Sequence, residues 1–159
     1  LDMKTQDIVD PIVSTNTIPA LARSGSSYYA LNRNGARFGS FDPATAAFAN
    51  IGNATFQCCV GNGNAALAID SQNVGYLTTI TDDFTAAQIR TVDLATGTLG
   101  MPVRITANPV PHTVDQRFFG GVLYAAQRDG SILSIDPSTG GSSIVTQTSI
   151  GVTAMEVVP

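Results

Sequence analysis

The densest acidic pair in the chain is Asp82 and Asp83, in the segment TDDFTAA at 81–87. Calcium in proteins takes about six to eight oxygen ligands, and paired carboxylates supply several of them. Asn64, in the segment GNGN, offers a further oxygen from a second loop. Asp82 and Asp83 are therefore candidate calcium ligands; the alternative is that they are solvated turn residues. No other metal site and no cofactor is predicted.

The single histidine, His112, stands in the segment NPVPHTVDQ. Catalysis of the Ser-His-Asp type would need an acid such as Asp115 beside it and an activated serine. The chain has no G-x-S-x-G motif, which presents such a serine in α/β-hydrolases. The alternative is a loop histidine without catalytic function, and we predict no catalytic residue. The candidate ligand contacts are Asn64, Asp82, Asp83, His112 and Arg128.

Cys58 and Cys59 are adjacent, and neighbours on a strand point to opposite faces, so an unstrained disulfide between them is not expected. Three interpretations stay open: one buried and one peripheral thiol, a strained bridge between the two, or a bridge to another chain. Two cysteines and one distant histidine do not have the ligand spacing of a zinc site. Asn53 begins an Asn-Ala-Thr glycosylation sequon, which applies if the source is eukaryotic and the chain is secreted.

The composition excludes two classes of partner. Only 13% of the 159 residues are charged, 43% are hydrophobic and the net charge is −4. The chain has no basic run that could neutralise phosphates, so nucleic-acid binding is not expected. No apolar stretch reaches the roughly 18 to 20 residues of a membrane-spanning helix. The low charge and the first residue, Leu1, predict a processed chain that is extracellular or periplasmic.

A repeat of about 47 residues organises the chain. Tyr29, Tyr76 and Tyr124 are followed by similar short apolar segments and are spaced 47 and 48 residues apart. A second motif recurs after each tyrosine, as SFDPATA at 40–46, TVDLATG at 91–97 and SIDPSTG at 134–140. An aspartate that caps backbone N–H groups, followed by Pro or Leu and by Thr, is typical of a turn. We interpret the motif as scaffold.

Each repeat predicts four short strands, because apolar residues alternate with polar ones between turn signals such as Arg-Asp-Gly. Apolar residues on both faces of these strands, as in ALAID, indicate sheets that are covered on both sides. The predicted fold is all-β, with 1–159 as a single domain. The predicted four-stranded units are approximately 18–60, 65–106 and 112–149, with lone strands at 5–13 and 152–158.

The repeats resemble those of the quinoprotein/YVTN-type β-propeller superfamily. The segment LYAAQRDGSILSIDPSTGG at 123–141 carries the resemblance best, and IRTVDLATGTLG at 89–100 matches its second half. The resemblance implies β-propeller-type blades of four antiparallel strands. Quinoprotein dehydrogenases carry a docking Trp in each blade, whereas this chain has no Trp.

Three blades do not complete a ring, which usually has at least about four. The chain is then a fragment of a longer ring, one of several chains that complete a ring or exchange strands, or a compact closed variant. Open edges favour pairing with another chain. The sequence therefore favours a non-catalytic module that binds a protein or a ligand, or assembles with itself. The alternative is a fragment of a lactonase-like or quinoprotein-like enzyme with a metal or small-ligand site on its loop face.

Overall fold

The fold is built from antiparallel β-sheets. The computed structural model describes residues 18–32, 36–55, 65–81, 85–106 and 112–149. In these ranges twelve strands form three sheets of four strands, each ordered as a simple meander. The described residues include no helix that could cross a membrane.

Each sheet takes up one predicted repeat. The first contains β1 (Ala20–Ser24), β2 (Ser27–Asn32), β3 (Arg37–Asp42) and β4 (Ala47–Thr55). The second contains β5 (Ala65–Ile69), β6 (Val74–Ile80), β7 (Ala87–Asp93) and β8 (Val103–Ile105). The third contains β9 (Thr113–Phe119), β10 (Val122–Gln127), β11 (Ser131–Ile135) and β12 (Ser142–Gln147).

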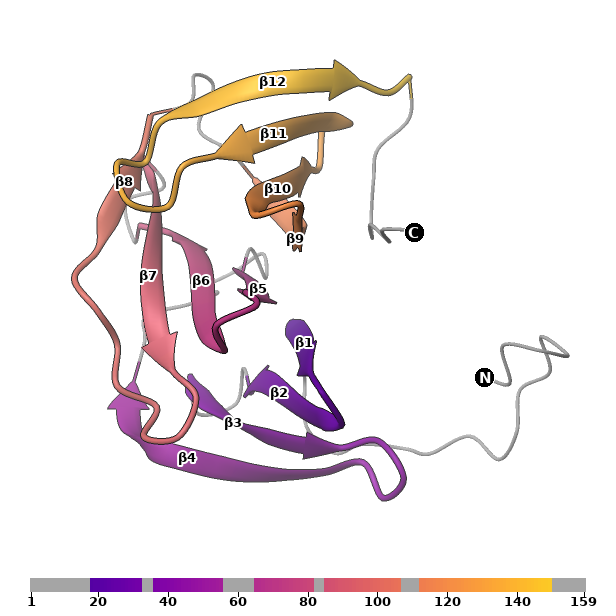
Figure 1. Ribbon diagram of the computed structural model, residues 1–159, viewed down its shortest axis with the longest axis vertical. Coiled ribbons are helices and arrows are strands. Elements are labelled where there is room, and N and C mark those ends of the chain that lie inside the picture. The colour runs from indigo at the N-terminus through magenta and orange to yellow at the C-terminus, as the bar shows by residue number, and fades with distance from the viewer. Residues whose placement is uncertain (1–17, 33–35, 56–64, 82–84, 107–111, 150–159) are drawn as a thin grey trace, which may run out of the picture.

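The three sheets stand side by side in an arc, as Figure 1 shows. The first strand of each sheet, β1, β5 or β9, lies on the inner side of the arc, and the fourth strand, β4, β8 or β12, lies on the outer side. The predicted all-β fold with four-stranded antiparallel blades is confirmed. The lone strands predicted at 5–13 and 152–158 fall outside the described residues.

The hydrophobic core lies between the blades. The cluster between the first and second blades consists of Ala22, Leu31, Phe38, Ala65, Leu67, Leu77, Val92 and Leu94. The cluster between the second and third consists of Ala68, Ala87, Ile89, Ile105, Leu123, Ala125, Leu133 and Ile135. The second blade is thus buried on both faces, which explains why its strands are apolar on both sides.

The recurring motif forms the turn between the third and fourth strands of every blade. Its aspartate, Asp42, Asp93 or Asp136, accepts a hydrogen bond from the N–H group two residues later, at 2.8 to 3.0 Å. It also accepts one from the threonine hydroxyl three residues later, at 2.7 to 3.0 Å. The aspartate therefore closes the turn, as the sequence predicted, because it satisfies backbone groups that the strands leave unpaired.

These hydrogen bonds lower the pKa of the three carboxyl groups. The largest contributions come from the Thr45 hydroxyl to Asp42, the Thr96 N–H group to Asp93 and the Ser138 hydroxyl to Asp136. A carboxyl group with a lower pKa in the folded chain stabilises the fold above its unfolded pKa. This contribution disappears as the pH falls through the folded pKa.

The turns of the second and third blades also lie against the outer strand of the blade before them. A Cβ atom built on Gly97 would lie closer than 3.0 Å to the carbonyl oxygen of Ile51 in β4. A Cβ atom on Gly140 would lie equally close to the carbonyl oxygen of Arg104 in β8. The Gly140 carbonyl in turn accepts hydrogen bonds from the N–H group of Thr106 at 2.9 Å and from its hydroxyl at 3.1 Å. We call this close approach of a turn to the preceding outer strand the turn joint.

The turn joint predicts a stability difference between two glycine substitutions. Gly140 and Gly120 have φ values of 74° and 56°, but a Cβ atom on Gly120 would meet nothing within 4 Å. The left-handed backbone costs alanine about 1 to 2 kcal/mol at either position. We expect Gly140→Ala to lose about 1 to 3 kcal/mol more than Gly120→Ala, because it also overpacks the joint. Urea denaturation measures both, and equal losses would contradict the joint.

The turn aspartates predict acid sensitivity. Because their folded pKa values are lowered, their contribution to the free energy of unfolding should be complete well above the ordinary Asp pKa of about 3.9 and should fall as the pH drops through and below it, where the unfolded carboxyl groups take up protons first. Asp93→Asn keeps the acceptor atom Oδ1, which receives the three hydrogen bonds made to this side chain, but does not titrate. We expect the free energy of unfolding of the variant to fall less steeply as the pH decreases. Urea denaturation between pH 6 and 2 measures this. Identical pH profiles would show that the turns do not cause the dependence.

Candidate functional site

Two of the predicted ligand contacts lie together at one end of the third blade. The N–H group of Arg128 donates to the carbonyl oxygen of His112 at 3.0 Å, so the loop before β9 meets the turn after β10. Asp129 is the next residue. Hydrogen bonds from the N–H group and hydroxyl of Ser131, and to a smaller extent the charge of His112, lower the pKa of Asp129. This end of the blade therefore holds a cation, a histidine and an ionised carboxylate.

The remaining sequence candidates fall in two groups. Asn64, Asp82, Asp83, Cys58 and Cys59 lie outside the described residues, so the calcium and disulfide interpretations stay predictions. Within the described ranges, no three His, Cys, Asp or Glu side chains gather as a metal site requires. Asn53 is exposed on the outer strand β4, and its carbonyl oxygen accepts a hydrogen bond from Arg37 at 2.9 Å.

The structure corrects the sequence interpretation of the third inner strand. In the sequence, the segment HTVDQ at 112–116 predicts the third inner strand, with Arg117 after its end. The strand β9 runs on to Phe119, so Arg117 lies within it. The apolar pair Phe118 and Phe119 explains the extension, because Phe118 packs against Tyr76 of the second blade with ring centroids 5.0 Å apart.

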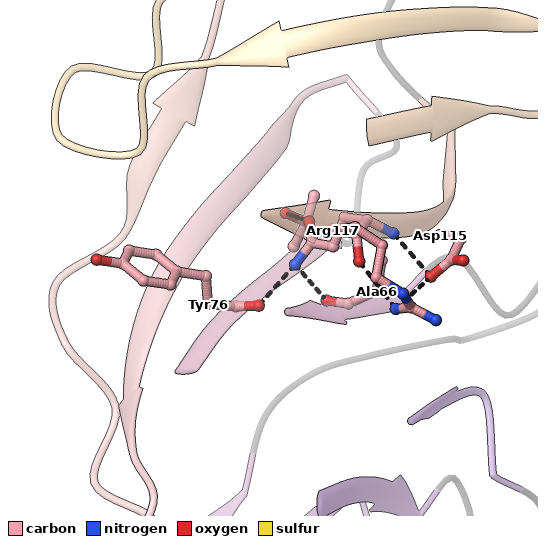
Figure 2. A network of polar contacts seen from close by, with 6 residues as sticks. Ala66, Tyr76, Asp115 and Arg117 are labelled. Carbon is pink, nitrogen blue, oxygen red and sulfur yellow. Dashed lines mark hydrogen bonds and ion pairs between the residues drawn. The ribbon is translucent and has the colours of Figure 1, made fainter. Parts of the chain in front are cut away.

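Gln116, at the centre of β9, joins the third blade to the second. Its side chain is fully buried. Its amide nitrogen donates to the carbonyl oxygens of Ala66 at 3.1 Å and Tyr76 at 2.6 Å, and its amide oxygen accepts the Thr78 hydroxyl at 2.7 Å. Figure 2 shows these bonds reaching the backbone of Ala66 and Tyr76. The strands β5 and β6 supply all three partners. Gln116 therefore fixes the position of the inner strand β9 along the strands of the second blade.

The sequence alone does not single out Gln116. The available signal was a glutamine two residues from Val114 and two from Phe118, so that all three share one side of a strand. A buried glutamine needs partners for both its amide nitrogen and its amide oxygen. The carbonyl groups that satisfy it lie 40 and 50 residues away. Only the packing of two blades brings them within reach.

The residues on either side of Gln116 point to the other side of the third blade, because side chains alternate along a strand. Arg117 and Phe119 lie opposite Tyr124 and Val122 of β10, and residues opposite each other share one side of a sheet. Asp115 belongs to the same side. The five residues Asp115, Arg117, Phe119, Val122 and Tyr124 define what we call the open face of the third blade. Among the described residues, no further sheet lies against it.

The open face differs from the matching faces of the other two blades. Tyr29 of the first blade stacks with Phe38 beside the cluster shared with the second blade. Tyr76 of the second blade packs on Phe118 of the third. Tyr124 is half-buried, as Tyr29 and Tyr76 are, but no described aromatic ring stacks on it, and Phe119 and Val122 beside it are 55% and 39% exposed.

One ion pair lies among these apolar side chains. Arg117 bonds to Asp115 at 2.8 Å and donates to the carbonyl oxygen of Gln116 at 2.9 Å. Figure 2 shows Asp115 and Arg117 side by side at β9. Exposed apolar side chains around a polar pair are typical of a surface that packs against protein. The open face is therefore the candidate functional site.

Comparisons with known proteins agree with this architecture. No protein-family model and no curated protein sequence matches the chain. Among solved structures, the chain is similar to the PQQ-bound aldose sugar dehydrogenase of Streptomyces coelicolor, with 18% identity and a TM-score of 0.57 over 84% of the chain. The glutaminyl cyclase of Myxococcus xanthus matches 80% of it, with 19% identity and a TM-score of 0.55. The computationally designed Ika4 protein matches 97%, with 18% identity and a TM-score of 0.52.

These similarities define the fold, which is that of propeller-type blades. At such identities they carry no information about activity. The matches span only 48% of the dehydrogenase and 52% of the cyclase, whereas they span 88% of the designed protein.

The bonds of Gln116 predict a stability difference between two buried glutamines. Gln127 is also buried, but its hydrogen bonds stay inside the third blade. Gln116→Ala removes three bonds to the second blade, and each partner left unsatisfied costs about 1 to 3 kcal/mol. We expect Gln116→Ala to lower the free energy of urea unfolding more than Gln127→Ala does. The reverse order would contradict a role in joining the blades.

Proposed function

We propose that this chain is a non-catalytic binding module of propeller type that acts outside the cytoplasm and binds protein through the open face of its third blade. The observation that carries the proposal is that the next blade covers this face of the first and second blades, whereas no described sheet covers the open face, where Phe119 and Val122 are 55% and 39% exposed. The low charge content supports an extracytoplasmic location.

The kind of partner follows from the two packed joints within the chain. At each of them, one blade presents an apolar face and an outer strand, and the next blade presents its inner strand and its turn. The third blade presents the first half of such a joint. A partner that supplies the second half buries apolar area, at a gain of about 25 cal/mol per Å² before the costs of association are subtracted. The partner surface that fits is therefore another propeller blade.

An extended chain tests the proposal. Residues 107–149 are repeated directly after residue 149, so that a copy of the third blade follows the natural one. We expect the free energy of unfolding to rise in a single cooperative transition, because the added blade packs on the open face. Urea denaturation followed by far-UV circular dichroism measures it. An extended chain that gains no stability would overturn the proposal.

A matched substitution tests whether the gain in the free energy of unfolding comes from packing on the open face. Val122→Asp places a charge on a half-exposed position of the natural chain, where surface substitutions change stability by about 0.5 kcal/mol or less. In the extended chain the same charge would be buried against the added blade and should abolish the gain. A large loss in the natural chain would show instead that this chain already covers its own open face.

A further inference from the structure

The last residue of the turn motif, which is the fifth position counted from its aspartate, differs between the three copies. The second and third copies have Gly97 and Gly140 there, and the first has Ala46. All three residues have positive φ, at 70°, 74° and 55°. The backbone conformation of the turn is therefore conserved between the repeats, and the difference is the methyl group of Ala46.

That methyl group stands where the turn joint leaves no space. At both joints, a Cβ atom at the fifth position would lie closer than 3.0 Å to a backbone carbonyl oxygen of the preceding outer strand, a distance that real Cβ atoms essentially never show. The blocking atoms are the carbonyl groups of Ile51 and Arg104, which are backbone and cannot rotate away as a side chain does. A blade with alanine at this position must therefore stand farther from the outer strand, and the apolar faces behind the turn separate as well.

We propose that the open face of the third blade is specific for a blade with glycine at the fifth turn position, carried by a different polypeptide or protein region. Ala46 excludes the first blade of a second copy from this joint. This inference rests on the proposed function and names the partner of the same face. Within the described residues no blade precedes the first one, so a glycine turn there would offer a second copy the matching half of the joint, and head-to-tail association would produce rings or filaments.

A single methyl group decides the specificity, so its removal should create binding. The double variant Ala46→Gly/Val122→Asp presents a glycine turn on its first blade and a blocked third blade. The wild-type chain presents an open third blade and an alanine turn. Each protein then has one competent surface, and a mixture can form only a one-to-one complex. We expect light scattering and sedimentation velocity to detect this complex, and we expect wild type alone to stay monomeric at the same total concentration.

The matched control is the single variant Val122→Asp mixed with wild type, in which Ala46 is retained. We expect at least a tenfold weaker association in this mixture. Circular dichroism melting curves establish that every variant is folded before it is mixed.

The outcomes separate the inference from the proposed function. If wild type associates with itself or with Val122→Asp as strongly as with the double variant, the open face binds protein but Ala46 is no barrier, and the inference is wrong. If no mixture forms a complex although the extended chain is stabilised, the face accepts a blade, but the glycine turn is not what selects it, and the inference is again overturned. If the extended chain also gains nothing, the proposed function itself fails.

Discussion

The close approach of each turn to the outer strand of the preceding blade is the constraint on which the structure depends. The aspartate holds the turn in shape by accepting hydrogen bonds from its N–H and hydroxyl groups. The glycine lets the turn come within contact of a backbone carbonyl oxygen. Because a blade is a thin sheet that cannot form a core by itself, this approach determines how closely the apolar faces meet. Loss of the approach would open both interblade clusters from their outer side.

The inner side of the second joint is fastened by different chemistry. Gln116 reaches across from β9 and satisfies two carbonyl groups of the second blade, while Phe118 packs on Tyr76 beside it. The hydrogen bonds of Gln116 on the inner strand and the contact of Gly140 with the outer strand β8 together hold the third blade against the second on both its inner and its outer side. The residues that alternate with Gln116 along β9 necessarily point to the opposite side. The strand that fixes one joint therefore also forms the open face.

Much of this fold can be predicted from the sequence, because the repeat exposes it. The spacing of Tyr29, Tyr76 and Tyr124 and the recurrence of the Asp-x-x-Thr turn predict four-stranded blades, and the structure confirms them. The turn motif is local, so its hydrogen bonds are readable within seven residues. The candidate site is different. The carbonyl partners of Gln116 are 40 and 50 residues away, and the assignment of Phe119 and Val122 to an exposed face requires the strand register. The sequence also ended β9 too early, since two adjacent phenylalanines do not show which of them packs inward.

Because the close approach of the turns holds the blades together, the turn joint should open only when the whole chain unfolds. Native-state hydrogen exchange at two equivalent threonines, each one residue beyond an outer strand, tests this directly. The N–H group of Thr106 donates across the joint to Gly140, whereas that of Thr148 donates to Gly130 within its own blade, at 2.9 Å in both cases. We predict that the Thr106 amide exchanges with the free energy of global unfolding and that the Thr148 amide exchanges at a lower one. Exchange of Thr106 at the lower free energy, with the core amides still protected, would contradict the claim.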